Sequence, residues 1–456
     1  MDDYRVIADE IAASIADGRL RPGEQLPTQR AFARRHGIAG STAGRVYREL
    51  VRRGLVVGEV GRGTFVRAAR GTPGVALAEP AVARVDLELN YPVVPEQSAL
   101  LAHGLAPMLR ADALDAALRP VGAAGTAAAR AAFASLASDT GAAAGDGAGG
   151  GAGWRAGADD VLFAANGRQA IAAALTALVP PGQRLGVEAL TYPVVKALAQ
   201  RLGITLVPLP TDADGLLPDA LPAVHRATPL HALYLQPRLH NPLGATLAPE
   251  RRAALAATLE RLGLPLVEDA IWSFLRPGTP PLAALAPEST VLVDSLSKRA
   301  APGLTTGFAV VPARFRASVT AALRSGGWTP SGFALEAGVR WIGDGTVAAI
   351  EEAKRVDATE RQRLARRILA GQALRSDPCS YHVWWELPPA WRAETFVAAA
   401  ARRGIAVTPA AAFTVDGRTS PSAVRVGLAS PPLPVLAGAL ETLALTAAGT
   451  PEDLLY

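Results

Sequence analysis

Cysteine and long apolar runs are scarce in this chain of 456 residues. Cys379 is the only cysteine, so no disulfide can form within the chain, which favours a reducing compartment such as the cytoplasm. No apolar run reaches the ~18 residues that a membrane span needs, so we expect no association with a membrane. The N-terminus, MDDYRVIADEIAASI, lacks the basic start and apolar core of a signal peptide, and we expect none.

The chain is long and its positive charge is unevenly distributed. Half of the residues are hydrophobic, and the length exceeds what one core usually organises, so we expect two or more domains. The first 70 residues hold thirteen arginines and eight acidic residues, which accounts for the whole net charge of +5. This asymmetry indicates a polyanion-binding N-terminal part on a neutral body.

Three helices and a hairpin are predicted at the N-terminus. Apolar spacing favours a helix over residues 4–17, and Thr28 can cap a second helix that stops at Gly37. A third helix begins near residue 41 and stops at Gly54. Two short β-rich stretches, LVVGEV and GTFVRA, follow and are joined by GRG, the tip of a tight hairpin. This order predicts a winged helix-turn-helix.

DNA binding needs arginines for the phosphates and a helix that can enter the major groove. The third helix offers both, with arginines along its length and small hydroxyl residues at its N-terminal end: Arg45, Arg48, Arg52, Arg53, Ser41 and Thr42. Arg62, between two glycines, lies on a tip slim enough to approach the DNA backbone. A solvated, arginine-rich surface is the alternative, and the charge segregation favours DNA.

The stretch GRLRPGEQLP…GRGTFV closely resembles the GntR-type winged helix family, and the match covers residues 4–66. The resemblance implies DNA contacts by Arg30, Ser41, Thr42, Arg45, Arg62 and Gly63. An arginine common at the start of the family's recognition helix is Gly40 here. One phosphate or base interaction is therefore missing or relocated, and the operator sequence is left open.

Beyond the glycine- and proline-containing residues 70–84, strands and helices alternate, which predicts an α/β domain. Seven segments are strand candidates: VLFAA, RLGVE, ITLVPLP, ALYLQ, LPLVED, TVLVDS and GFAVVP. The low-complexity stretch at 141–153 is predicted to be a surface insertion without an assigned function.

Lysine is rare, because only three of the 46 lysines and arginines are lysines. One of them, Lys298, follows a short apolar strand in SLSK. A lysine that forms a Schiff base must be desolvated and held so that its amine can be neutral, and this position supplies both conditions. A lone lysine is otherwise a surface cation, so the features that precede Lys298 decide its interpretation.

Several polar features lie ahead of and behind this lysine. The NGRQA segment opens a helix whose N–H groups can hold a phosphate, and Tyr192 can stack on a flat cofactor. Asn241 offers a donor in a proline-fixed loop, and a buried Asp269 needs a cationic partner such as a protonated pyridine nitrogen. Arg425 can pair with a carboxylate. Each feature alone is equally compatible with ordinary packing or a solvent-facing position.

Together these features resemble the class I aminotransferases of the pyridoxal-phosphate (PLP) proteins, from about residue 85 to 445. The resemblance implies the following roles: Lys298 as the catalytic Schiff-base lysine, Asp269 at the pyridine nitrogen, Asn241 at the ring hydroxyl, Tyr192 at the ring face, Gly167, Arg168, Gln169 and Ser295 at the phosphate, and Arg425 at a substrate or effector carboxylate. A winged helix fused to such a body is the architecture of the MocR subfamily of transcriptional regulators.

The sequence departs from the aminotransferase pattern at three positions. A phosphate-binding arginine is Thr305 here, the tyrosine expected three residues after the aspartate is Trp272, and a tyrosine expected from the neighbouring subunit aligns with Pro120. Losing a charge-assisted hydrogen bond costs ~1.5–3 kcal/mol, roughly a ten- to hundred-fold weaker cofactor affinity. Arg168 is a candidate to compensate.

The resemblance implies a winged helix-turn-helix (α+β) at residues 1–69, a linker at 70–84, and an α/β PLP-dependent transferase fold of fold type I at 85–456. It also implies a head-to-tail homodimer with the pocket at the subunit interface, and we expect no metal ion. The favoured function is a DNA-binding regulator that senses a small amine or amino acid through PLP. A working aminotransferase and a cofactor-free dimerisation scaffold are the alternatives.

Overall fold

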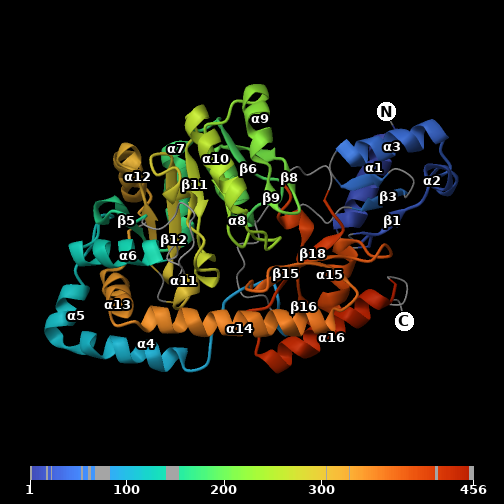
Figure 1. Ribbon diagram of the computed structural model, residues 1–456. Helices are drawn as coiled ribbons and strands as arrows, with labels where there is room; N and C mark the ends of the chain where they lie inside the picture. Colours follow the sequence, from blue (N-terminus) through green and yellow to red (C-terminus); the bar gives the residue numbers. More distant parts are fainter. Residues whose placement is uncertain are drawn as a thin grey trace.

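The computed structural model describes most of the chain, namely residues 3–16, 19–21, 23–52, 55–59, 63–66, 83–139, 154–303, 306–327, 329–415 and 420–450. The described residues form an N-terminal head, a large domain built on a wide sheet, and a small C-terminal domain (Figure 1). Most of the predicted linker and all of the glycine-rich segment 141–153 lie outside these residues, as does Thr305. Among the described residues, no helix combines the length and apolar character needed to cross a bilayer.

The head has the predicted order of helices and strands. Its elements are α1 (Asp3–Ala16), β1 (Gln25–Leu26), α2 (Gln29–His36), α3 (Gly40–Arg52), β2 (Val56–Glu59) and β3 (Gly63–Val66). The Thr28 hydroxyl accepts the Ala31 N–H at 3.3 Å, and Gly37 ends α2 in the left-handed region, as predicted. Helix α3 begins at Gly40, just before the predicted start at Ser41 or Thr42. The three strands pair in the order β1-β3-β2.

All seven predicted strands form one sheet in the order β5-β13-β12-β11-β10-β6-β7. Their bounds are β5 (Val161–Ala164), β6 (Arg184–Glu188), β7 (Thr205–Leu209), β10 (Ala232–Leu235), β11 (Leu266–Asp269), β12 (Thr290–Ser295) and β13 (Gly307–Val310). The five strands from β7 to β12 are parallel, and β13 runs antiparallel to both of its neighbours. The central strands are buried on both faces, which explains why they are continuous apolar runs in the sequence.

Helices cover both faces of the sheet. One face packs against α7 (Gly167–Leu178), α8 (Pro193–Leu202) and α12 (Ala313–Ser325). The opposite face packs against α6 (Ala127–Asp139), α10 (Pro249–Leu262) and α13 (Gly332–Gly343). Because successive strand residues point to opposite faces, Tyr234 belongs to the first core and its neighbours in β10 to the other. Shorter elements complete the large domain: α4 (Gln97–Leu105), η1 (Ala106–Leu109), α5 (Ala111–Ala117), η2 (Ala158–Asp160), β8 (Thr211–Asp212), β9 (Gly215–Leu216), η3 (Pro218–Ala220), α9 (Leu221–Ala227), η4 (Ser273–Leu275), η5 (Leu282–Ala284) and α11 (Leu296–Arg299).

The small domain is an antiparallel sheet in the order β14-β15-β18-β17, backed by α15 and α16. Its elements are β14 (Ala373–Arg375), β15 (His382–Glu386), α15 (Ala393–Arg402), β16 (Ile405–Ala406), β17 (Thr408–Pro409), η6 (Ala410–Ala412), β18 (Ala423–Gly427) and α16 (Leu433–Ala448). Strand β4 (Val85–Asp86) pairs with β16, so the chain leaving the head joins this domain before it enters the large one.

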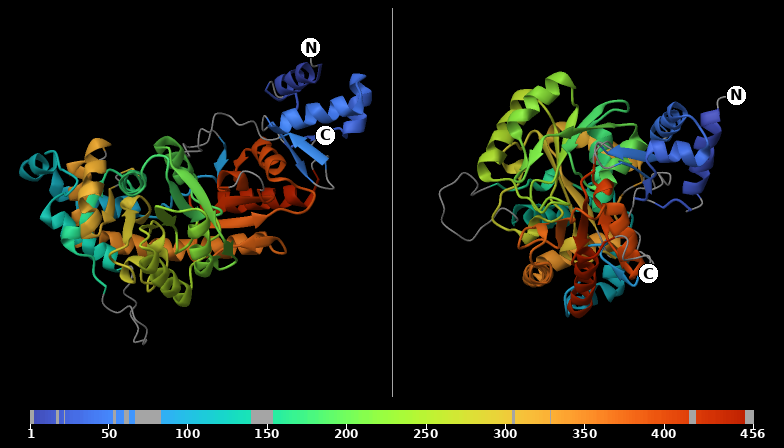
Figure 2. Two further views of the ribbon diagram at one scale, coloured as in Figure 1. Left: turned by 90° about the horizontal axis from the view of Figure 1, so that it is seen from above. Right: turned by 90° about the vertical axis from the view of Figure 1, so that its right-hand side faces the viewer.

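Helix α14 (Thr346–Ile368) spans the two domains of the body. It packs against α4, α11 and α13 at one end and against α16 and β15 at the other (Figure 1). The head lies beside the small domain (Figure 2), where the Arg392 guanidinium lies 3.8 Å from the centre of the Phe65 ring. A single rigid helix therefore connects the two halves of the body, and a cation–π contact joins the body to the head.

Candidate functional site

A pocket lies at the carboxyl ends of the parallel strands, where ligands bind in open α/β sheets. Residues that follow β5, β6, β10, β11 and β12 converge there, because parallel strands all end at the same edge. The cavity has a volume of about 280 Å³. Another cavity, beside Glu188 and His240, measures about 10 Å³, which is room for one water molecule. The pocket is therefore the candidate ligand site.

Lys298 lies in this pocket, on the short helix α11 that follows β12. Its ammonium donates to the Asn90 carbonyl at 2.7 Å and lies 4.0 Å from the centre of the Tyr91 ring. Burial lowers the pKa of Lys298 well below its ordinary value, and the nearby positive charges of Arg168, Arg425 and Lys354 act in the same direction. A lysine in this environment is readily neutral, which is the state that reacts with an aldehyde.

Asp269 ends β11 at the floor of the pocket and is 4% exposed. Its Oδ2 accepts hydrogen bonds from the Tyr234 hydroxyl at 2.5 Å and from the Gln236 amide at 2.9 Å. No basic side chain of the described residues forms an ion pair with it, and burial raises its pKa to about 6. The carboxylate is therefore oriented by neutral donors and presented to a cation that enters the pocket.

One edge of the pocket is formed by the turn between β5 and α7. Asn166 caps α7, because its side-chain oxygen accepts the Gln169 N–H at 3.0 Å. A Cβ added at Gly167 would lie 3.3 Å from Oγ of Ser295, a tight contact that would require the serine to shift. Asn166, Gly167, Arg168 and Ser295 line the cavity, but Gln169 does not. The structure therefore brings together three of the four residues predicted for an anion.

Arg425 lies on β18 of the small domain, facing the pocket, and is 8% exposed. Its guanidinium donates to neutral acceptors, namely the Glu88 carbonyl, Thr408 Oγ1 at 3.1 Å and Asn241 Oδ1 at 3.4 Å. Its Nε has no hydrogen-bond partner among the residues that the structure describes, and burial lowers the pKa of Arg425 to about 10. A buried guanidinium whose hydrogen bonds go to neutral groups provides a place for a carboxylate.

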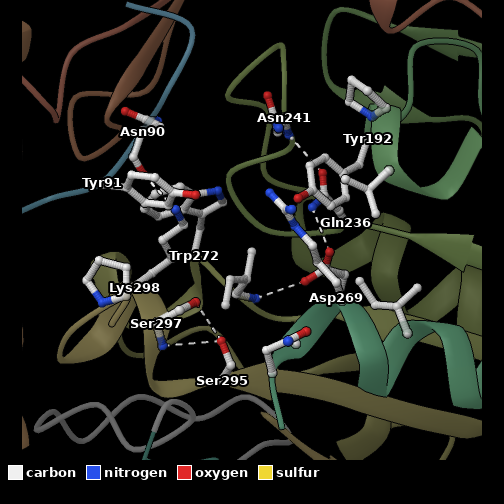
Figure 3. A pocket seen from close by; sticks show the side chains of 18 of the residues that line it. Asn90, Tyr91, Tyr192, Gln236, Asn241, Asp269, Trp272, Ser295, Ser297 and Lys298 are labelled. Atoms are coloured by element: carbon white, nitrogen blue, oxygen red, sulfur yellow. Dashed lines mark hydrogen bonds between the residues drawn. The ribbon is translucent and has the colours of Figure 1, made fainter. Parts of the chain in front are cut away.

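The remaining lining residues form two aromatic walls. Figure 3 shows Tyr91 and Trp272 beside Lys298, and Tyr192 on the opposite side near Asp269 and Asn241. The Trp272 ring centre lies 5.4 Å from the Lys298 ammonium, while Tyr192 lies close enough to Arg168 to raise the pKa of that guanidinium. A flat ring between these walls would contact aromatic faces on both sides.

The head presents a charged face on α3. Val46, Tyr47 and Leu50 are buried in its core, while Arg45 and Arg48 are exposed. Arg30 and Ser41 are exposed as well, Thr42 is half-buried, and Gly63 has a φ of 118° at the start of β3. Arg62 lies outside the described residues. The helix is amphipathic, and its exposed face carries the arginines predicted to meet DNA.

Comparison with known proteins agrees with both halves. Residues 125–443 match the model for aminotransferase class I and II, and residues 3–66 match that for bacterial regulatory proteins of the gntR family. The chain belongs to the aminotransferase class I and II family. It carries a GntR-type domain at its N-terminus, which is the MocR arrangement predicted from the sequence.

This chain is similar to several curated proteins that are named as HTH-type transcriptional regulators. It is 28% identical to the uncharacterized HTH-type transcriptional regulator YdeF of Bacillus subtilis, over 94% of this chain and 90% of that protein. It is 35% identical to the pyridoxine biosynthesis transcriptional regulator PdxR of Corynebacterium glutamicum, over 36% of each. Among solved structures, an archaeal alanine:glyoxylate aminotransferase matches with a TM-score of 0.71 and 17% identity, over 89% of this chain and 94% of that one. That likeness confirms the PLP-dependent transferase fold of the body.

Two of the three departures from the family pattern can be located. Trp272 lies in the pocket, where its indole faces Lys298, while Pro120 does not line the cavity. No three His, Cys, Asp or Glu side chains of the described residues are grouped as metal ligands.

Four residues of the site were not predicted from the sequence: Asn90, Tyr91, Tyr234 and Gln236. For Tyr234 and Gln236 a signal existed, because ALYLQ places polar atoms at alternate positions near the end of a buried strand.

Proposed function

We propose that the body of this GntR-type transcriptional regulator holds PLP and senses a small amine or amino acid, and that the head binds double-stranded DNA. One observation carries the proposal. The same chain contains a winged helix with exposed arginines and a pocket with a lysine whose pKa is lowered by burial. From the DNA partner we also infer a cytoplasmic location.

The pocket fits PLP by the chemistry of its donors. Lys298 would meet the aldehyde, Asp269 the pyridine nitrogen and Asn241 the ring hydroxyl, with Tyr192 at the ring face. Asp269 supports this fit because, within the described part of the chain, its carboxylate is hydrogen-bonded by neutral donors and has no ion pair. The Gly167 backbone supports it because the glycine leaves an anion room to approach. When bound, PLP supplies an aldehyde that condenses with amines.

The anion-binding end of the pocket has an altered set of donors. Thr305 and Pro120 remove two expected phosphate contacts, and Trp272 cannot accept a hydrogen bond. Loss of one such phosphate contact costs about 1.5–3 kcal/mol, so we expect an affinity for PLP ten- to hundred-fold weaker than that of an enzyme with the full set. We propose Arg168, which lines the cavity, as the replacement cation. Gln169 would contribute to the anion site from the first turn of α7.

An effector amine would enter beside Lys298, and its carboxylate, where it has one, would bind Arg425. Because Arg425 belongs to the small domain and Lys298 to the large one, a ligand that contacts both favours one arrangement of the two domains. Arg392 of the small domain contacts Phe65 of the head, so a movement of the small domain would also move the head. We propose a head-to-tail homodimer, in which two heads move relative to one another on DNA.

A DNA-binding experiment tests this function. Operator fragments are selected from a genomic library with the full chain, and the complexes are then titrated with PLP and with a panel of amines and amino acids. We expect selected sites whose occupancy changes when PLP and one amine are both present. Failure to select any DNA would contradict the regulator function. Borohydride reduction followed by peptide mapping is expected to label Lys298, and Lys298→Ala is the control.

A working aminotransferase is the second candidate, favoured by the match over residues 125–443. Repeated turnover needs firm anchoring of the cofactor phosphate, and the substitutions at Thr305 and Pro120 oppose it. Conversion of amino acids to ketoacids at a rate above that of Lys298→Ala would support catalysis. A protein that acquires no visible absorbance after addition of PLP would instead indicate a cofactor-free scaffold.

A further inference from the structure

Lys354 is a buried lysine outside the pocket lining that contacts the segment carrying Lys298. It lies on α14 and is 0% exposed. Its ammonium donates to three successive carbonyls, those of Lys298 at 2.8 Å, Arg299 at 3.2 Å and Ala300 at 2.8 Å. An ammonium has three donors and no acceptor, so these three carbonyls satisfy the group completely.

The three carbonyls lie where α11 ends. This helix has only four residues, and the carbonyls at a helix C-terminus have no partner within the helix. A cation at that end also interacts favourably with the helix dipole. Lys354 therefore supplies what the turn lacks: without it, buried carbonyls would lose their hydrogen bonds. The planar fork of an arginine is poorly suited to three carbonyls that converge on one point, so a lysine suits this position better than the arginine that is far commoner in the chain.

A second set of hydrogen bonds holds the same turn from its other side. Arg299, the residue after Lys298, donates to Asp294 Oδ2 at 3.0 and 2.7 Å and to Glu351 Oε1 at 2.5 Å. Glu351 lies on α14, one turn before Lys354. The backbone around Lys298 is thus fixed to α14 by two buried side chains. Arg299 of α11 donates to Glu351, and Lys354 of α14 donates to the carbonyls of residues 298–300.

We propose that Lys354 is a positioning residue for Lys298. By binding the carbonyls of residues 298–300 it fixes the turn so that the Lys298 amine points into the pocket, toward Asn90 and Tyr91, rather than away from it. The proposal rests on the assignment of Lys298 as the reactive amine of the pocket, which is part of the proposed function. Lys354 itself contacts no ligand and is not a catalytic residue.

The pKa of each of the two lysines depends on burial and on the charged groups around it. Lys298 faces Arg168 from α7, Arg425 from β18 and Lys354 from α14, and all three lower its pKa in addition to burial. Burial lowers the pKa of Lys354 to about 7, while Glu351 and Asp357 on its own helix oppose that shift. Removal of Lys354 therefore changes both the position of the Lys298 turn and one of the charges that Lys298 experiences.

The rarity of lysine makes a direct experiment possible, because only three lysine peptides have to be told apart. The cofactor-free full chain is acetylated with trace acetic anhydride over a series of pH values, and the labelling of Lys298 is followed by mass spectrometry. The variants are Lys354→Met and, as a matched control, Arg361→Met. Arg361 is a buried cation on the same helix that also donates to two carbonyls, those of Leu428 and Pro431, but not to the Lys298 turn.

In Lys354→Met we expect the midpoint pH of Lys298 labelling to rise by roughly half a unit or more, since a nearby positive charge is removed and the amine becomes more hydrated. We also expect PLP binding, followed by absorbance, to weaken about tenfold. Arg361→Met should leave the midpoint unchanged. An unchanged midpoint in Lys354→Met would overturn the proposal.

Lys354→Gln serves if the methionine variant does not fold, as judged by its melting curve, and is expected to shift the midpoint in the same direction by less. The labelling needs no cofactor. If the wild-type chain binds no PLP, the proposed cofactor is contradicted. The labelling still tests whether Lys354 positions Lys298.

Discussion

The Tyr234 hydroxyl donates a hydrogen bond of 2.5 Å to Oδ2 of Asp269, from the neighbouring strand of the sheet. Tyr234 is fully buried and projects from β10 beneath the pocket, while Asp269 ends β11. Burial raises the pKa of Asp269 to about 6, and the hydrogen bonds from Tyr234 and Gln236 oppose that shift. The charge state of Asp269, and with it the attraction for a cationic ring, therefore depends on a residue that touches no ligand.

Tyr234→Phe is expected to weaken PLP binding about tenfold. The substitution removes one hydrogen bond to a carboxylate, worth ~1.5–3 kcal/mol, and so raises the pKa of Asp269 further and leaves it more often neutral. Titration of the cofactor absorbance measures the affinity. Tyr47→Phe is the control, since Tyr47 is a buried tyrosine of the head whose hydroxyl donates to the Pro27 carbonyl. Equal affinities in the two variants would contradict the role of Tyr234.

Asp269→Asn is expected to change how the stability of the cofactor-free chain depends on pH. The folded pKa, raised from 3.8 to about 6, means that the folded chain binds more protons than the unfolded chain between these values. The contribution of Asp269 to the free energy of unfolding is therefore highest below about pH 4, falls as the pH rises to about 6, and is constant above.

The asparagine variant lacks this loss, which amounts to about 3 kcal/mol at most. As the pH rises from about 4 to about 6, the melting temperature of the variant should therefore increase relative to that of the wild type. The variant should also bind PLP more weakly than the wild type. Thermal melts of both proteins across this range provide the measurement. A difference between the two that does not vary with pH would show that Asp269 ionises normally.

Arg425→Gln is expected to weaken the response to effectors that carry a carboxylate. Loss of a charge-assisted, two-point interaction costs ~2–3 kcal/mol, so roughly 30- to 100-fold more amino acid would be needed to change the DNA complex. The response to the corresponding decarboxylated amines should be unaffected. Arg425→Lys keeps the charge without the planar fork and should lie between the two. Loss of sensitivity to both classes of ligand would argue against a carboxylate site.

Arg45→Ala and Arg48→Ala are each expected to weaken DNA binding at every sequence tested. Both side chains are exposed on α3, and the removal of one arginine–phosphate interaction should reduce the slope of log affinity against log salt by about one. Binding measured at several salt concentrations gives this slope. Arg261→Ala, at an exposed arginine of α10 in the body, is the control. An unchanged slope in the α3 variants would place the DNA on another surface.

Much of the fold could be predicted from local signals. The seven strands of the large sheet are short apolar runs, and the caps at Thr28 and Gly37 depend only on neighbouring residues. The place of Lys298 in the pocket could also be predicted, because SLSK follows a buried strand and lysine is rare, and its role as a Schiff-base lysine stays a prediction. The predicted start of α3, at Ser41 or Thr42, comes after the observed one, since Gly40 is a poor helix former that the surrounding structure nevertheless includes in the helix.

The sequence by itself determined the elements of the head, the seven strands of the large sheet, and that a cationic head precedes an α/β body, because these depend on periodicity, capping and charge along the chain. Only the tertiary structure decided which distant groups meet. Lys298 donates to the carbonyl of Asn90, 208 positions away, and Lys354 binds the turn of a lysine 56 positions earlier. Such contacts leave no periodic trace in the sequence, since chain closure over these separations is decided by packing of whole elements rather than by local preference.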